Sequence, residues 1–205
     1  MNLEEIIKNC KVCNGKGEIL KEGHLVECEC REKVKRYTFY NSMRLPLRFF
    51  EYELSFRKGQ NLAIKKVIDN YINTLQENYE NGLNVVMISK NIELRSAFLI
   101  HILKSLYSFS YTGAYTTLVE LFVDKQFNNY LRQHFLMIDN FEVDVDITKF
   151  EYELLGLTRL LEYRYLNKLP VLISTSYTKN EFESVFKSTI SKFIFTNCIT
   201  LVMKE

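Results

Sequence analysis

Between Asn84 and Met203, short apolar segments alternate with segments that have helical periodicity. The apolar segments carry apolar side chains on both faces, a pattern typical of strands in a parallel sheet that is covered on both sides. The chain therefore predicts an α/β fold with a parallel five-stranded sheet and helices on both faces. The expected strands are Asn84–Ile88, Ala114–Thr117, His134–Asp139, Pro170–Ser176 and Cys198–Met203, and the expected helices are Leu62–Tyr79, Leu94–Leu106, Leu118–Asn129, Phe150–Asn167 and Lys179–Phe186.

The first expected strand and the helix after it are joined by the segment SKNIELRS, Ser89 to Ser96, which predicts an eight-residue loop. A strand, a loop and a helix in this order form the frame of a phosphate-binding loop, whose pattern is G-x-x-x-x-G-K-[ST]. Ser89 and Leu94 stand at the two glycine positions, Arg95 stands at the lysine position, and only Ser96 matches the pattern. The frame of a nucleotide-binding loop is present without its chemistry.

Loss of the glycines removes the backbone freedom with which N–H groups close on phosphate oxygens. Asn91 is expected to cap the following helix. Glu93 then lies at the helix N-terminus, where the helix dipole favours an anion, and we expect its carboxylate to take the place of a phosphate. Arg95 is expected either to pair with Glu93 or Asp139 across the site or to remain without either acid.

Four of the five cysteines lie close together in the sequence, with the spacing C-x₂-C-x₁₄-C-x-C. Two close pairs of thiolates suit the tetrahedral coordination of a structural Zn²⁺ ion, and the CNGKG turn after the first pair permits the left-handed backbone of a metal knuckle. The expected ligands are Cys10, Cys13, Cys28 and Cys30, with His24 as an alternative to one of them. Because four thiolates leave no open position, the zinc would be structural. Cys198 is expected to be a small apolar side chain inside the last strand.

The composition adds few constraints on partners. The net charge of +2 argues neither for nor against nucleic acid. No apolar run is long enough to span a membrane, and the acids in MNLEEIIKNC are not typical of a secretory signal, so that a cytoplasmic location is expected. Residues 1–45 predict a zinc-ribbon domain with a basic helix, residues 46–60 a connector, and residues 61–205 the α/β core. Arg44–Phe50, which contains Pro46, is expected to be extended.

The order of these features resembles the DnaC/DnaI helicase loaders and their IstB-like relatives, which are AAA+ proteins of bacterial and phage replication or transposition. The resemblance covers almost the full length. It lies in the four-cysteine ribbon, in CECREK, in RLPLRF (Arg44–Phe49), in AYTTLVELF (Ala114–Phe122), in HFLMIDNF (His134–Phe141) and in LLEYRYLNKLPVLISTS (Leu160–Ser176). It implies an AAA+ core, here without a lid, and zinc in the ribbon.

The resemblance also identifies the positions at which nucleotide chemistry would be located. Asp139 stands where the Mg²⁺-binding acid belongs, but Asn140 replaces the acid that would activate water, and neutral Asn cannot act as a general base. Ser176 stands at the sensor asparagine, and Lys192 at the arginine finger, where it lacks the planar fork of arginine. The expected degenerate site therefore comprises Ser89, Glu93, Arg95, Ser96, Asp139, Asn140, Ser176 and Lys192, and neither ATP with Mg²⁺ nor a catalytic residue is expected.

The function that the resemblance implies is that of a replicative helicase loader or adaptor, a pseudo-ATPase that binds a hexameric DnaB-type helicase. Two alternatives remain open at this stage: an inhibitor or decoy of helicase loading, and an active AAA+ ATPase of the IstB type. The basic and aromatic run from Arg31 to Tyr40 suits single-stranded DNA, or else forms a helix face that docks on protein. Self-assembly is expected to be weak. The acidic run Glu142–Asp146 predicts a surface loop.

Overall fold

The computed structural model describes residues 3–54, 60–143, 147–186 and 188–203. The chain forms two compact units, Met1–Tyr52 and Glu53–Glu205, and the boundary between them falls within the predicted connector. Within the described residues, no helix has the length and the apolar character that crossing a membrane requires.

The first unit is a small β-hairpin between two helices. It comprises α1 (Leu3–Lys8), β1 (Glu18–Lys21), β2 (His24–Glu27), α2 (Glu29–Ser42) and the 3₁₀ turn η1 (Leu47–Phe49), with β1 and β2 antiparallel. The expectation that Arg44–Phe50 is extended was wrong. Pro46 begins the 3₁₀ turn, and Phe50 is buried against the rings of Tyr37 and Tyr40, so that burial of aromatic surface overrides the extended preference.

The second unit is an α/β layer structure. Its elements are α3 (Gln60–Asn73), α4 (Leu75–Glu80), β3 (Asn84–Ile88), α5 (Ile92–Phe109), β4 (Gly113–Thr117), α6 (Leu118–Asp124), η2 (Phe127–Tyr130), β5 (Phe135–Asp139), η3 (Ile147–Phe150), α7 (Glu151–Leu166), β6 (Val171–Thr175), α8 (Lys179–Val185), α9 (Ser188–Phe195) and β7 (Cys198–Val202). The strands form one sheet in the order β4-β5-β6-β3-β7, and all neighbouring strands are parallel. The predicted five-stranded parallel sheet is confirmed.

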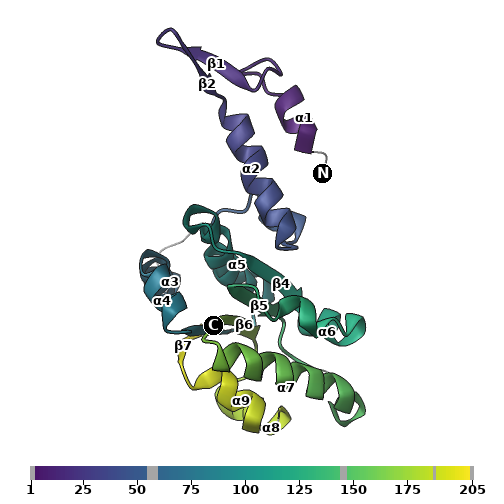
Figure 1. The fold of residues 1–205 in the computed structure, drawn as a ribbon. Helices are drawn as coiled ribbons and strands as arrows, with labels where there is room; N and C mark the ends of the chain where they lie inside the picture. Colours follow the sequence, from purple (N-terminus) through teal and green to yellow (C-terminus); the bar gives the residue numbers. More distant parts are fainter. Residues whose placement is uncertain (1–2, 55–59, 144–146, 187, 204–205) are drawn as a thin grey trace. The chain divides into compact units, whose positions relative to one another are not determined.

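Helices cover both faces of this sheet (Figure 1). The α5 helix packs on β3, β4, β5 and β6 with α3 outside it, whereas α7 and α9 pack together on the opposite face. Alternate residues of β3 point to opposite faces of the sheet, and Val86 and Ile88 pack in the core beneath α7 and α9. Because β3, β5 and β6 are buried along their whole length, both of their faces had to be apolar.

The predicted helix Leu118–Asn129 is broken. Lys125 adopts a left-handed conformation (φ 53°) and ends α6, and a 3₁₀ turn then brings Tyr130 into the core. The helix from Leu62 is likewise interrupted, at Thr74, between α3 and α4. The α9 helix was not predicted. It is short and rich in residues that also suit strands, and burial of Ile190 and Ile194 one turn apart fixes it as a helix.

Candidate functional site

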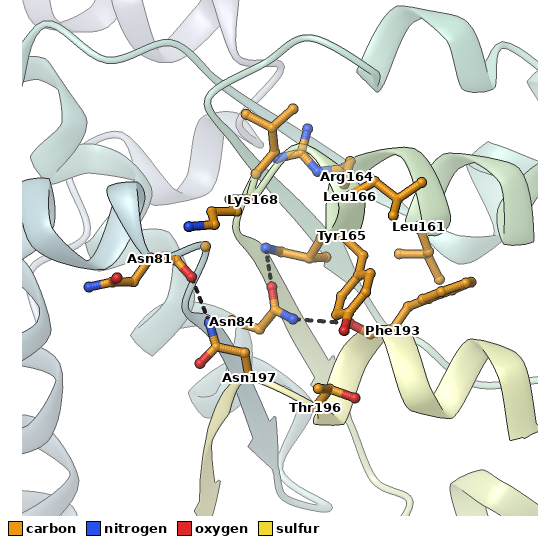
Figure 2. Close-up of a pocket in the computed structure, with 13 residues that line it drawn as sticks. Asn81, Asn84, Leu161, Arg164, Tyr165, Leu166, Lys168, Phe193, Thr196 and Asn197 are labelled. Carbon is orange, nitrogen blue, oxygen red and sulfur yellow. Dashed lines mark hydrogen bonds between the residues drawn. The ribbon is translucent and has the colours of Figure 1, made fainter.

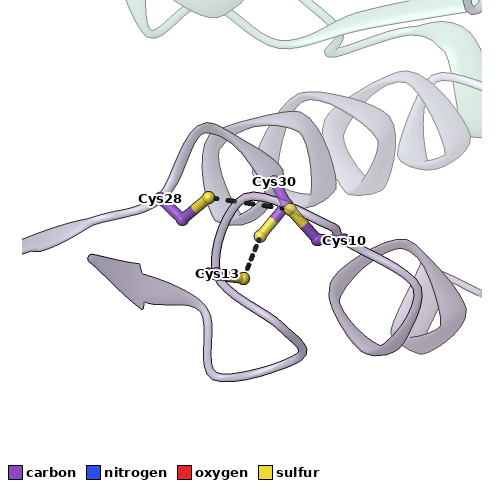
Figure 3. Close-up of side chains that lie close together, drawn as sticks. All are labelled: Cys10, Cys13, Cys28 and Cys30. Carbon is purple, nitrogen blue, oxygen red and sulfur yellow. Dashed lines mark hydrogen bonds between the residues drawn. The ribbon is translucent and has the colours of Figure 1, made fainter.

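The four cysteines of the first unit converge at one point (Figure 3). Cys10 and Cys13 come from the turns after α1, Cys28 is the N-cap of α2, and Cys30 lies in its first turn. All four sulfur atoms lie within 4.8 Å of one another; Cys10 and Cys28 are 3.8 Å apart, and Cys13 and Cys30 are 3.6 Å apart. A tetrahedron of sulfur atoms at about 2.3 Å from a metal has edges of about 3.8 Å. The geometry therefore fits one tetrahedral metal ion.

The backbone around the cysteines is shaped for this cluster. Gly17 has a φ of +75°, a conformation that residues with a side chain rarely adopt, so that any substitution there would be strained. Its N–H donates to the Cys13 sulfur at 3.2 Å, and its carbonyl accepts from the Cys28 N–H at 2.9 Å. His24 is exposed in β2 beside the hairpin turn and is not a member of the cluster. Among the described residues, the cluster therefore offers four sulfur atoms and no nitrogen atom as possible metal ligands.

Two of the thiols differ widely in acidity. Burial raises the pKa of Cys13, but hydrogen bonds from the Gly17 N–H and the neighbouring thiols outweigh it and bring the pKa to about 7. Burial and the same neighbours raise the pKa of Cys30 to about 12. A bound metal must therefore displace protons that the cluster otherwise retains. Cys198, by contrast, is half-buried in the edge strand β7 and takes no part.

The expected eight-residue loop after β3 is only three residues long, because α5 begins at Ile92. Asn91 caps the helix as predicted, since its side chain accepts from the Leu94 N–H at 3.0 Å. The Asn91 N–H in turn donates to the Ser89 hydroxyl at 3.0 Å. Good helix formers without a glycine allow the helix to start one turn earlier than the phosphate-loop frame requires. The segment therefore forms a tight turn with internal hydrogen bonds.

Arg95 is completely buried beneath this turn. Its guanidinium donates to the Ser89 carbonyl at 2.6 Å and to the Asn140 side-chain oxygen at 2.9 Å, and it lies 2.5 Å from the Glu142 carboxylate. Glu142 also accepts from the Ser176 N–H at 2.5 Å. The buried cation is thus neutralised by an acid from the segment after β5.

Neither acid that we had considered for Arg95 is its partner. Glu93 is exposed, and residues two apart on a helix point in different directions, so that its carboxylate cannot reach the Arg95 side chain. That Glu93 takes the place of a phosphate at the helix N-terminus stays a prediction, whereas the carboxylate that Arg95 contacts is that of Glu142. Glu142 lies in a loop, as predicted, but its side chain is only 22% exposed because it contacts Arg95, while Asp144–Asp146 lie outside the described residues.

Asp139, at the end of β5, is the centre of a second buried network. The Ser96 hydroxyl lies 2.8 Å from both carboxylate oxygens, the Tyr115 hydroxyl donates to one at 2.9 Å, and the Ser174 hydroxyl donates to the other. The Asn140 N–H adds a contact of 3.1 Å. A carboxylate has about four acceptor positions, and these donors fill them, so that the arrangement leaves little capacity for a cation.

The remaining predicted site residues are only partly brought together. Ser176 lies directly after β6 and contributes its backbone N–H, not its hydroxyl, to the Glu142 contact. Lys192 is exposed on α9, and within the described residues none of its contacts reaches the Ser89–Asp139 region. Sequence reasoning missed Glu142, Ser174 and Tyr115. For Glu142, its position just after β5 was the available signal, because strand ends in a parallel sheet meet at one edge. Tyr115 and Ser174 lie inside β4 and β6, where the sequence gives no such signal.

Three of the four cations of the basic run Arg31–Arg36 pair with acids of the same unit, whereas Arg36 is exposed. Arg31 lies 3.5 Å from Glu18, Lys33 lies 2.7 Å from Glu51, and Lys35 lies 2.6 Å from Glu27. Tyr37 and Tyr40 are buried within the unit. These cations and rings are therefore poorly placed for tracking a nucleic acid backbone and stacking its bases.

A cavity of about 320 Å³ opens at the other edge of the sheet, at the first residues of β3 and β6 (Figure 2). Asn84 crosses it: its amide donates to the carbonyls of Phe193 and Ile194, and its side-chain oxygen accepts from the Val171 N–H. Arg164 is buried beside it and donates to four backbone carbonyls. Since Asn84 and Arg164 form hydrogen bonds with the protein's own backbone, their role at this cavity is to hold the neighbouring loops in place.

No family model matches the chain, and no match was found among curated protein sequences. Solved structures do match. The DnaC helicase loader is 17% identical, with a TM-score of 0.64 over 78% of this chain and 100% of its own. DnaI is 11% identical, with a TM-score of 0.63 over 78% and 92%. A putative primosome component from Streptococcus pyogenes is 14% identical, with a TM-score of 0.62 over 78% and 90%.

At these identities the likeness establishes the fold. It confirms the architecture that the sequence motifs implied, a parallel five-stranded sheet with a four-cysteine cluster near the N-terminus. The chain has the fold of the DnaC helicase loader and of DnaI.

Proposed function

We propose that this protein is a replicative helicase loader or adaptor that binds a hexameric DnaB-type helicase and works without ATP. The observation that carries the proposal is that the chain has the fold of a helicase loader, while its own side chains fill the position where a nucleotide would bind. Arg95, which replaces the phosphate-binding lysine, is fully buried and held by Glu142, Asn140 and Ser89. A triphosphate would have to displace these partners and rebuild a loop that is now helix.

The Mg²⁺ position supports the same conclusion. Asp139 is 1% exposed, and its oxygens accept from three hydroxyl groups. A hard cation requires free oxygen ligands with room for water, and this pair of Ser96 and Asp139 offers neither. Asn140 cannot act as a general base. The residues therefore do not fit a bound ATP–Mg²⁺, and we derive no hydrolytic step for this chain.

The first unit is the proposed contact with the helicase. Leu20 and Leu25 face each other across the hairpin, and each is 72% exposed. Val12, in the same unit, is 71% exposed. Exposed apolar side chains gathered on a small unit favour a protein partner, whereas the neutralised cations of α2 weaken the case for DNA. Zinc held by the four cysteines would keep this hairpin folded, since so small a core cannot do so alone.

Loading without hydrolysis requires only differential binding. A partner that binds an open helicase ring more tightly than a closed ring shifts the population toward the open form. Release would then depend on the helicase, on primase or on DNA, because this chain has no nucleotide cycle to time it. Self-assembly should also be weak, since Lys192 replaces the arginine that would reach a neighbouring nucleotide.

Mixing the protein with the replicative helicase of its native cell tests the proposal. We expect a complex by light scattering in the absence of nucleotide, and faster loading of the helicase onto single-stranded circles. Slower loading would instead identify a decoy that blocks the helicase. If no complex forms, both functions are refuted.

A matched pair of double variants tests the surface. Leu20→Ser with Leu25→Ser should weaken the complex at least about tenfold, because apolar anchors at an interface carry most of its binding energy. The control is Val119→Ser with Val123→Ser, which removes two exposed valines from α6 in the other unit. Equal losses from both pairs would contradict the assignment of the hairpin as the contact.

A further inference from the structure

The Glu142 carboxylate is bound by the protein in the manner of a ligand. One of its oxygens accepts from the Arg95 guanidinium and from the Ser176 backbone N–H, both at 2.5 Å. Arg95 is fully buried, while the Glu142 side chain is 22% exposed. A buried cation and a backbone N–H that converge on one oxygen atom form a small oxyanion site, which here is filled from within the chain.

The backbone on both sides of Glu142 fixes its position. Asn140 turns the chain with a left-handed φ of 49°, and Phe141 is then buried against the rings of Phe182 and Phe186. On the other side, the Tyr177 hydroxyl donates to the Val143 carbonyl at 2.9 Å and accepts from the Val143 N–H at 3.3 Å. The carboxylate is therefore presented by an anchored segment, and its contact with Arg95 is a specific one.

If the Glu142 carboxylate is removed, the buried cation of Arg95 has no negatively charged partner. Its other acceptors, the Ser89 carbonyl and the Asn140 amide, are neutral, and its Nε–H has no acceptor among the described residues. A buried charge without a counterion is strongly destabilising. A core that lacks the Glu142 carboxylate should therefore gain stability from any other anion that can pair with Arg95.

We propose that Arg95 and the Ser176 N–H form an oxyanion-binding site for which Glu142 is the tethered occupant, and that a free small oxyanion such as inorganic phosphate binds there when the Glu142 carboxylate is removed. The inference deepens the proposed function, since it rests on a nucleotide position that the chain closes with its own side chain. It assigns the closure to Glu142 and not to Glu93.

Anion-dependent melting of variants provides the test. Glu142→Ala should be stabilised by millimolar inorganic phosphate by about 3 °C or more beyond the shift caused by sodium chloride of equal ionic strength. The unmodified protein and Glu142→Gln, whose amide still fills the space, should show no such excess. Glu153→Ala is the matched control, because Glu153 also pairs with a cation, Lys125 at 2.8 Å, and is 12% exposed.

A phosphate shift equal to that of Glu153→Ala would overturn the proposal, because it would be a general salt effect. If Glu142→Ala does not fold, Glu142→Asp decides, since a carboxylate one methylene shorter cannot hold both donors and should leave the same phosphate response. No excess shift in Glu142→Asp would then refute the inference. These outcomes are independent of ATP binding by the unmodified protein, which bears on the proposed function alone.

Discussion

Replacing Arg95 by alanine should strongly destabilise the α/β unit. This is expected even though Arg95 stands at the position of the lysine that binds phosphate in a nucleotide-binding loop. The substitution removes two hydrogen bonds of a buried cation, to Ser89 and Asn140, and its ion pair with Glu142. Breaking a buried pair costs about 3–5 kcal/mol, and the partial exposure of Glu142 places the loss toward the lower end. For a unit of this size, about 3 kcal/mol lowers Tm by roughly 6–12 °C.

The assay is thermal unfolding of the full chain in a buffer without phosphate, followed on the transition of the larger unit. Lys125→Ala is the control, because the Lys125 side chain is 65% exposed and loss of its pair with Glu153 should change Tm by less than about 2 °C. The double variant Arg95→Ala with Glu142→Ala should be more stable than the sum of the single losses predicts, since the cation leaves together with its anion. A shift for Arg95→Ala as small as that of the control, or strictly additive losses, would refute the account of Arg95 as a buried structural cation.

Three further predictions follow from other parts of the molecule. Chelation should remove one zinc ion per chain and unfold the first unit while the α/β unit stays folded. In elemental analysis, Cys13→Ser should abolish metal binding and Cys198→Ser should not. Retention of metal by Cys13→Ser would exclude the four-sulfur site. Metal affinity should fall as the pH is lowered, because Cys30, whose pKa is about 12, is protonated throughout the neutral range, and it should fall more steeply below about 7, where Cys13 is protonated as well. A competitive metal titration at two pH values that finds a pH-independent affinity would contradict this. Arg164→Met should lower the free energy of unfolding by about 3 kcal/mol in urea titrations, since four backbone carbonyls lose their donor; a loss below about 1 kcal/mol would contradict this role.

The sheet was predictable because strands that are buried on both faces appear in the sequence as continuous apolar runs. Val85, Val86 and Ile88 had to be apolar whichever layer each one serves, and the same constraint holds for β5 and β6. The cysteine cluster was predictable because metal coordination fixes residue type and spacing together. The Asn91 cap could be read from local chemistry alone.

The partner of Arg95 was not predictable in the same way. Glu93 is near it in sequence, whereas Glu142 comes from the far side of two helices and two strands and meets it only because β3 and β5 end at the same edge of the sheet. Ser174 escaped attention for a related reason, since a serine inside a buried strand gives no sign that its hydroxyl faces Asp139. The length of the turn after β3 was also missed, because a motif frame assumes a loop where this sequence prefers helix.

Calorimetric titration of the purified protein with ATP and Mg²⁺ tests the central claim most directly. A nucleotide position that is closed by the pair of Arg95 and Glu142, with the oxygens of Asp139 already occupied, predicts no saturable heat up to about 1 mM nucleotide, where even weak specific binding would be visible. Saturable binding in the micromolar range that is lost in Arg95→Ala, under conditions in which that variant is still folded, would contradict it.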